Sequence, residues 1–299
     1  MITLKQIQYA LEVSETLNFR RAADNCCISA SALSSALGEL EKNLGVDLFE
    51  RNNKTVLLTQ FGKEFCEKAR KINILTADIE TLATSYFHPL NNHIKVGVIP
   101  TISPYLLPTL LPTINSKYPK LSLELIENQS SILIKKLKAG WIDFAILALP
   151  FDLEGLSYQR FWEEDFFWIT HKNDPKALKK EITADMLEGS NLMLLDDGHC
   201  LTEHALEVCK IKNAHRYAIE ASSLMTLVQL VSCRMGTTLI PAMAVKQSLA
   251  SNPLVSAVHL DEPGPHRTIA AIYRPTYPNV EGINLFVNLI RNVLKNSSV

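Results

Sequence analysis

The chain has 299 residues, of which 47% are hydrophobic and 20% charged, enough for a folded interior divided over two or three domains. Its formal net charge of −1 excludes attachment to nucleic acid or membrane by bulk charge alone, so any nucleic-acid site has to be local. No apolar leader and no run of about 18 apolar residues is present. We therefore expect a cytoplasmic protein with no membrane partner.

The six cysteines favour reduced thiols over a disulfide framework. The chain contains no Cys-x-x-Cys and no Cys/His cluster with zinc spacing. In a chain of this size without a leader, an even cysteine count is more typical of the reducing cytosol than of a secreted scaffold. We expect no structural metal and no cofactor.

The first 60 residues predict three helices followed by a hairpin. Apolar residues recur at helical spacing over about residues 4–13, 19–25 and 29–44, behind the candidate N-caps Thr3, Asn18 and Ser29. The third helix should stop at Gly45. Two short apolar strands then flank Asn52-Asn53. This order predicts a winged helix-turn-helix DNA-binding domain over residues 1–60.

A long helix is expected next, from Thr59 to about Phe87, within a linker segment at residues 61–90. Its apolar residues form one stripe that includes Phe61, Phe65, Ala69, Ile72, Ile79 and Leu82. A lone helix of this length must bury such a stripe, and a second copy of the chain is the simplest partner. The segment therefore predicts a homo-oligomer.

Residues 91–299 alternate strands and helices, which predicts an α/β effector domain with a mostly parallel sheet. We expect strands at about residues 94–99, 121–126, 144–149, 166–170, 192–195, 217–221, 237–240 and 269–273, and a last helix over residues 279–295.

In a winged helix-turn-helix, the third helix enters the major groove with its N-terminal residues against base edges. Hydroxyl side chains there can bond bases or phosphates, and cations on the wing and nearby helices suit the phosphate backbone. The candidate DNA-binding residues are Lys5, Arg20, Ser29, Ser31, Ser34, Ser35, Arg51 and Lys54. Residues 1–65 hold seven Lys and Arg against eight Asp and Glu, which weakens the electrostatic part of that binding.

Cys200 and Cys209 form a thiol pair on a short helical segment after a Gly198 turn. The helix N-terminus and His199 would favour the Cys200 thiolate. If residues 200–209 are one helix, the two Cα atoms lie roughly 13–14 Å apart and on opposite faces. A disulfide needs them within about 7 Å. Closing the pair would therefore require the segment to unwind, which suits a switch.

Several motifs together resemble the LysR-type transcriptional regulators over essentially the whole chain. The matching stretches are Phe19–Ala23, Ser29–Glu41, Leu44–Val46, Leu48–Arg51 and Leu58–Gly62. The resemblance implies a long helix that pairs two subunits and a two-lobed effector domain like a periplasmic binding protein. It also implies a dimer of dimers on double-stranded promoter DNA, and contact with RNA polymerase. Ala30-Ser31 replaces the family's usual Gln-Pro, and Ala36 and Gly38 stand where basic or amide side chains are common.

The segment Leu195–Cys200 with Cys209 resembles the peroxide-sensing members of that family. The resemblance implies a peroxidatic role for Cys200, a resolving role for Cys209, and activation of oxidative-stress genes. It places Thr101, Ser130, His199 and Arg267 around a hydrogen peroxide pocket. Ser130 stands where the family has threonine, and His266 where it has arginine.

Other interpretations remain open. One is a regulator of the same family that binds a small metabolite between the lobes, with Thr101, Ser130 and Arg267 holding a carboxylate. Another is an enzyme, a thiol peroxidase; the family favours a protein that is not an enzyme. The winged helix could serve protein contacts alone, and Thr101 and Ser130 could simply cap helices. The remaining cysteines, Cys26, Cys27, Cys66 and Cys233, are expected to be small buried hydrophobes.

Overall fold

A computed structural model describes the chain except for residues 52–54, 91–92, 188, 197, 210–220 and 298–299. It consists of two compact units, Met1–Ala83 and Thr84–Val299. The expected strand at 217–221 and the candidate Lys54 lie largely or wholly outside the described residues.

The first unit contains the expected three helices and hairpin, α1 (Leu4–Thr16), α2 (Phe19–Asn25), α3 (Ala30–Leu44), β1 (Phe49–Arg51) and β2 (Val56–Leu58). All three predicted N-caps are confirmed, since the side chains of Thr3, Asn18 and Ser29 each accept a backbone N–H of the following helix. Gly45 ends α3 with φ +71, a conformation that favours glycine.

A buried carboxylate connects the hairpin to α3. Glu41, 8% exposed, accepts backbone N–H groups of Leu48 (2.9 Å) and Phe49 (3.2 Å) through one oxygen. These bonds fix where the hairpin leaves the helix. The exposed side of α3 carries Ser31, Ser35 and Gly38.

The long helix is α4 (Gln60–Ser85). Its first half is buried through Cys66 and Ala69, which pack with Ile7 and Leu11 of α1. The second half of the stripe is exposed in a single chain: Ile72 is 41% exposed, Leu75 58%, Ile79 68% and Leu82 52%.

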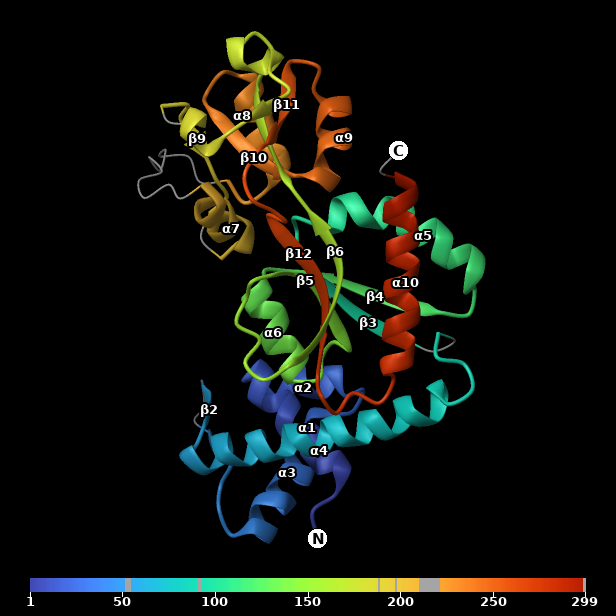
Figure 1. Ribbon diagram of the computed structural model, residues 1–299. Helices are drawn as coiled ribbons and strands as arrows, with labels where there is room; N and C mark the ends of the chain where they lie inside the picture. The colour runs from blue at the N-terminus through green and yellow to red at the C-terminus, as the bar shows by residue number, and fades with distance from the viewer. Residues whose placement is uncertain (52–54, 91–92, 188, 197, 210–220, 298–299) are drawn as a thin grey trace. The chain divides into compact units, whose positions relative to one another are not determined.

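The second unit has two lobes, each built on a five-stranded sheet. The first sheet has the order β4-β3-β5-β12-β6, formed by Ser122–Glu127, His93–Val98, Phe144–Leu149, Arg267–Tyr273 and Ser157–Glu164. Helices α5 (Ser103–Lys117) and α10 (Val280–Ser297) pack together on one side, and α6 (Ser130–Lys138) lies on the other (Figure 1).

The second sheet has the order β8-β11-β7-β10-β9, formed by Glu181–Ile182, Val255–Leu260, Phe166–His171, Thr237–Pro241 and Leu192–Met193. Helices α8 (Leu224–Ser232) and α9 (Ala242–Ser251) pack on it, and two short 3₁₀ turns, η1 (Pro175–Leu178) and η2 (Ala184–Leu187), precede β8 and β9.

In each sheet four of the five strands run in the same direction, as a mostly parallel sheet requires, and one strand runs against them. β12 runs antiparallel to both β5 and β6, and β7 runs antiparallel to both β10 and β11. The chain crosses between the lobes at Glu164–Phe166, where β6 passes into β7, and returns before Arg267, where β12 begins. These crossing strands enter each sheet from the other lobe, which reverses their direction.

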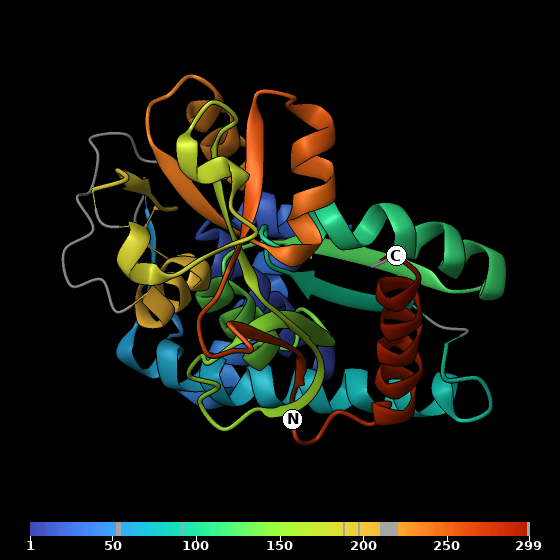
Figure 2. The same cartoon turned by 45° about the horizontal axis from the view of Figure 1, so that its top comes forward.

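Helix α7 (Cys200–Cys209) lies between the two lobes (Figures 1 and 2). Cys200 belongs to the apolar core of the first lobe, whereas Leu201 and Ala205 belong to that of the second. One short helix therefore contributes to both cores.

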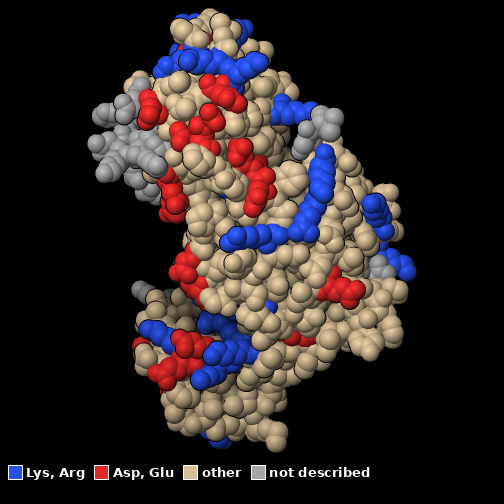
Figure 3. Space-filling model, in the orientation of Figure 1, with Lys and Arg blue, Asp and Glu red and all other residues tan. Residues whose placement is uncertain are grey.

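Charged side chains of both signs are scattered over the face of the molecule seen in Figure 3. On the face of Met1–Ala83 seen in Figure 3, basic and acidic side chains lie next to one another, in keeping with the near-neutral composition of that segment.

Among the described helices, none combines the length and apolar character needed to cross a lipid bilayer.

Candidate functional site

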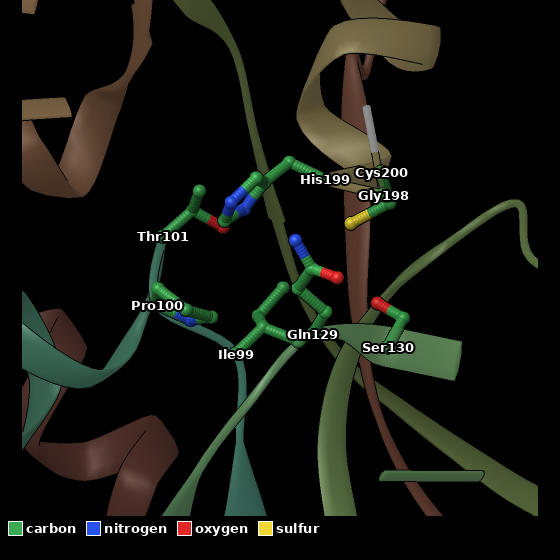
Figure 4. Close-up of a pocket in the computed structure, with 8 residues that line it drawn as sticks. All are labelled: Ile99, Pro100, Thr101, Gln129, Ser130, Gly198, His199 and Cys200. Carbon is green, nitrogen blue, oxygen red and sulfur yellow. The ribbon is translucent and has the colours of Figure 1, made fainter. Parts of the chain in front are cut away.

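A small pocket brings together four of the residues singled out in the sequence, Thr101, Ser130, His199 and Cys200. Its walls come from the turn after β3, the start of α6 and the turn into α7. Figure 4 shows the Cys200 sulfur, the Ser130 hydroxyl and the Gln129 amide turned toward one space, with Thr101 and His199 along its side. The lining residues are Ile99, Pro100, Thr101, Gln129, Ser130, Gly198, His199 and Cys200.

The pocket is narrow, and no water-sized molecule fits between its side chains. Gly198 contributes to this close packing, since a Cβ there would meet Gln129 Oε1 at 2.7 Å and its φ is +98. A side chain at position 198 would therefore both strain the turn and push Gln129 aside.

Cys200 is 3% exposed and begins α7. Burial raises the pKa of its thiol, while the Arg267 guanidinium, the Ser130 hydroxyl and the Ala148 backbone lower it. Desolvation is the largest of these effects, and neither the helix N-terminus nor His199 is among the causes that lower the pKa. The His199 ring instead faces Asp196, with Nε2 3.2 Å from Oδ1.

Arg267 is the buried cation beside the pocket. It is 1% exposed; its Nε donates to Glu164 Oε1 (2.8 Å), and its Nη1 to Thr101 Oγ1 (3.1 Å). Nη2 donates to the Thr101 carbonyl (3.3 Å) and approaches Met243 Sδ (3.8 Å). The other Glu164 oxygen accepts the Met243 N–H (2.9 Å). The guanidinium is thus fixed from both lobes.

Neither Thr101 nor Ser130 acts as a helix cap. No side-chain cap bond is present at the start of α5 or α6, so this alternative is wrong. The Thr101 hydroxyl accepts from Arg267. Ser130 is 1% exposed, and within the described part of the chain its Oγ makes no hydrogen bond of ordinary geometry, although it lies close enough to Cys200 to lower the pKa of the thiol.

The two thiols of the predicted switch stand at opposite ends of one helix. α7 runs from Cys200 to Cys209, as expected. Ten helical residues place the terminal Cα atoms roughly 13–14 Å apart, beyond the range of about 7 Å that a disulfide allows. The Cys209 side chain lies outside what the structure describes.

The candidate DNA-binding residues are placed on the first unit. Lys5, Arg20, Ser29, Ser31 and Ser35 are exposed, and Ser34 is half-buried. Ser29 is both the N-cap of α3 and a partner of Ser31, at an Oγ–Oγ distance of 3.1 Å. Arg51 lies in β1, but its side chain is outside the described part.

Comparison with known families identifies the family to which the chain belongs. Residues 4–63 match the bacterial regulatory helix-turn-helix protein of the lysR family, and residues 88–295 match the LysR substrate binding domain. The chain belongs to the LysR family. It is a DNA-binding transcriptional regulator with a helix-turn-helix domain and a two-lobed effector domain.

Two relatives of this LysR-family protein differ in what their names state. The HTH-type transcriptional regulator EstR of Acinetobacter baylyi is 35% identical over 294 residues, 97% of each chain. A hydrogen peroxide-inducible genes activator of Dickeya chrysanthemi is 34% identical over 278 residues, 93% of this chain and 91% of the relative.

Solved structures of OxyR are similar over nearly the whole chain. Full-length OxyR from Pseudomonas aeruginosa, with a cysteine-to-aspartate substitution, superimposes with a TM-score of 0.80 at 32% identity, covering 97% of this chain and 95% of that one. A cysteine-to-serine mutant of Corynebacterium glutamicum OxyR, with hydrogen peroxide bound, gives 0.67 at 30%, covering 99% and 94%.

Two residues around the pocket of this LysR-family protein were missed in the sequence. Gln129 gave a weak signal, as a polar residue directly after a strand and before Ser130. Glu164 gave no signal, because three consecutive acidic residues, Glu163-Glu164-Asp165, are typical of a solvated surface.

Among the described residues, no group of three or more His, Cys, Asp or Glu side chains is arranged to hold a metal ion.

Proposed function

We propose that this LysR-family protein senses hydrogen peroxide through Cys200 and regulates oxidative-stress genes, acting as a regulator and not as an enzyme. The observation that carries the proposal is the buried Cys200 thiol facing Ser130, with the fixed Arg267–Thr101 pair beside the same pocket. The similarity to OxyR, including a peroxide-bound structure, supports it.

The chemistry proceeds in two steps. The Cys200 thiolate attacks one oxygen of the peroxide; an S–O bond forms, the O–O bond breaks, and the leaving hydroxide takes a proton to become water. The Cys209 thiolate then attacks the Cys200 sulfur, forming the S–S bond while the S–O bond breaks and a second water leaves. Arg267 stabilises the negative charge on the departing oxygen, and Thr101, Ser130 and His199 bind the peroxide.

Two barriers keep the resting protein reduced. The pKa of the Cys200 thiol is raised by burial, so little thiolate is present at neutral pH. The pocket is also too narrow for a peroxide molecule until its walls move apart. Once Cys200 is oxidised, closing the disulfide requires α7 to unwind, which turns the chemical event into a change of conformation.

The functional result of sensing is the binding of promoter DNA by an oligomer of the chain. We propose the division into residues 1–60 for DNA, 61–90 for pairing and 91–299 for sensing. The exposed half of the α4 stripe, including Leu75 and Ile79, suits a second copy of the same helix. A dimer of dimers, activation through RNA polymerase and a cytoplasmic location complete the proposal.

The test is disulfide mapping in the full-length protein. Peroxide should produce a Cys200–Cys209 disulfide in the wild type, detected by peptide mass spectrometry and reversed by thiol reductant. C200S should form none, and C209S should stop at the Cys200 sulfenic acid. C233S is the matched control, since Cys233 is an exposed free thiol away from the pocket. Absence of the disulfide would overturn the proposal, and footprinting of both redox forms on the protein's own promoter would test the output.

A metabolite-responsive regulator is the second candidate. The 35% identity to EstR, whose name mentions no peroxide, favours it. Thr101, Ser130 and Arg267 would then hold a carboxylate, which needs an open pocket between the lobes. In that case C200S should keep its normal response to inducing conditions, whereas under the peroxide proposal it should be unresponsive. Sustained peroxide consumption with a thiol reductant would instead indicate a thiol peroxidase.

A further inference from the structure

Cys26 and Cys27 are adjacent thiols in the turn between α2 and α3. Cys26 is half-buried and packs against the core of the three helices, and Cys27 is exposed. Both are free cysteines. The expectation that both are small buried hydrophobes was therefore wrong for Cys27, as it was for Cys233.

The backbone of this turn is unusual. Cys27 has φ +55, a left-handed conformation that a residue with a side chain seldom adopts outside Asn and Asp. Its N–H donates to the Asp24 carbonyl (3.1 Å), and the next N–H, of Ile28, to the Ala23 carbonyl (3.0 Å). The two bonds hold the exposed thiol at the point where the chain turns into α3.

The surroundings of Cys26 favour its protonated thiol. Burial raises the pKa of Cys26, as do the neighbouring Glu12 carboxylate and Cys27. Peroxide reacts with thiolates, so Cys26 is a poor peroxide target. A soft trivalent centre that condenses with two neighbouring thiols suits the pair better, since consecutive Cα atoms lie about 3.8 Å apart and a local movement lets both sulfurs reach one atom.

We propose that Cys26 and Cys27 form a dithiol site for trivalent arsenicals, and that occupation of this site prevents DNA binding. With an organoarsenical oxide, two As–S bonds form and both As–O bonds of the oxide group break. Its oxygen leaves as water with the two thiol protons, and arsenic stays trivalent, so no oxidant or reductant is needed. The proposal is independent of peroxide sensing at Cys200.

Loss of DNA binding follows from the position of the turn. Ser29, two residues after Cys27, caps α3 by accepting the Ala32 N–H (3.2 Å). To share an arsenic atom, the Cys26 sulfur must leave the core or Cys27 must change its backbone conformation. Either movement displaces the start of α3, where the hydroxyl side chains that face DNA are clustered. The adduct also adds bulk beside that surface.

The experiment uses the full-length protein and phenylarsine oxide as the probe. Peptide mass mapping should place one arsenical per chain on the peptide that holds Cys26 and Cys27. The affinity for a labelled duplex from the protein's own promoter region should fall at least about tenfold, and 2,3-dimercaptopropanol should restore it.

Matched variants make the result decisive. C27N should bind DNA but not the arsenical, because Asn tolerates the left-handed conformation and lacks the thiol. C27S serves as a second variant, and C233S, which loses another exposed thiol, should behave as the wild type. An arsenical mapped to other cysteines, or an adduct on Cys26 and Cys27 with unchanged DNA affinity, would overturn the proposal.

Discussion

Arg267 and Glu164 form an ion pair that is completely removed from water. Arg267 Nε lies 2.8 Å from Glu164 Oε1, and the two side chains are 0% and 2% exposed. Glu164 ends β6, just before the chain crosses into the second lobe, and Arg267 begins β12, just after the chain returns. The ion pair therefore joins the two connections between the lobes. It also determines where the positive charge beside Cys200 is held.

Removal of either partner should strongly destabilise the protein. R267Q leaves a buried carboxylate without its cation and should lower the free energy of unfolding by about 3–5 kcal/mol. The double variant E164Q/R267Q should lose less than the sum of the two single variants, as measured by urea unfolding. K138Q is the control: Lys138 and Glu154 form a partly exposed ion pair, so its loss should cost less than about 1 kcal/mol. Additive losses would contradict a coupled buried pair.

Ser130 should affect the chemistry more than the stability. S130A removes a hydroxyl that lowers the pKa of Cys200 and should slow sulfenic acid formation by roughly three- to tenfold, the value of one net hydrogen bond. Because its Oγ makes no ordinary hydrogen bond among the described residues, the unfolding free energy should change by less than about 1 kcal/mol.

S130T is the matched variant, since it keeps the hydroxyl and should react at close to the wild-type rate. Dimedone trapping in a C209S background measures the reaction. Equal rates for S130A and S130T would remove Ser130 from the pocket chemistry.

His204 should make the docking of α7 sensitive to acid. Its ring is 2% exposed and Nε2 lies 2.9 Å from the Pro150 carbonyl. Burial lowers its pKa, as does Arg267, whereas the Pro150 contact, Glu203 and Glu207 raise it. The unfolded chain therefore binds the proton more readily, and this stability is present above the ordinary histidine pKa of about 6.5 and is lost as the pH falls below it.

The measurement is thermal unfolding of wild type and H204Q between neutral and mildly acidic pH. The wild type should lose up to about 1.4 kcal/mol more per pH unit than H204Q over this window. H88Q, at an exposed histidine, should follow the wild type. Parallel pH curves for wild type and H204Q would show that His204 does not control this loss.

Gly38 should tolerate larger side chains. It lies inside α3 on the exposed face, and a Cβ there meets nothing within 4 Å. G38A should raise the free energy of unfolding by up to about 1 kcal/mol through helix propensity. G38K should bind duplex DNA with a steeper salt dependence, by about 0.9 in the logarithmic slope for one added phosphate contact. An unchanged slope would show that this face of α3 does not approach the phosphate backbone.

The local elements were predictable because they depend on neighbouring residues. Helical spacing and the caps Thr3, Asn18 and Ser29 located α1 to α3, and the thiol pair was correctly placed at the two ends of α7. The resemblance to a family predicted that Thr101, Ser130 and the pair His199-Cys200 share one pocket, although these three positions are distant in the sequence.

Features that depend on tertiary contacts were missed. β6 and β11 were not predicted, and the antiparallel direction of β12 cannot be deduced from its own residues, since an apolar strand looks the same in either direction. Glu164 looks like a surface carboxylate until Arg267 is known to lie beside it. Similarly, the position of Cys200 at the start of a helix suggests a lowered pKa for its thiol. Its burial, which raises that pKa, becomes known only from the folded structure.

The shared position of α7 has a consequence for how sensitivity can evolve. Because Leu201 and Ala205 pack in the second lobe while Cys200 packs in the first, undoing the helix loses contacts in both. Substitutions at Leu201 or Ala205 would alter the cost of the switch without touching the sulfur or its hydrogen-bonding partners. Under the proposed peroxide sensing, the energy needed to undo the helix and the speed of the sulfur chemistry can therefore be adjusted separately, by different residues.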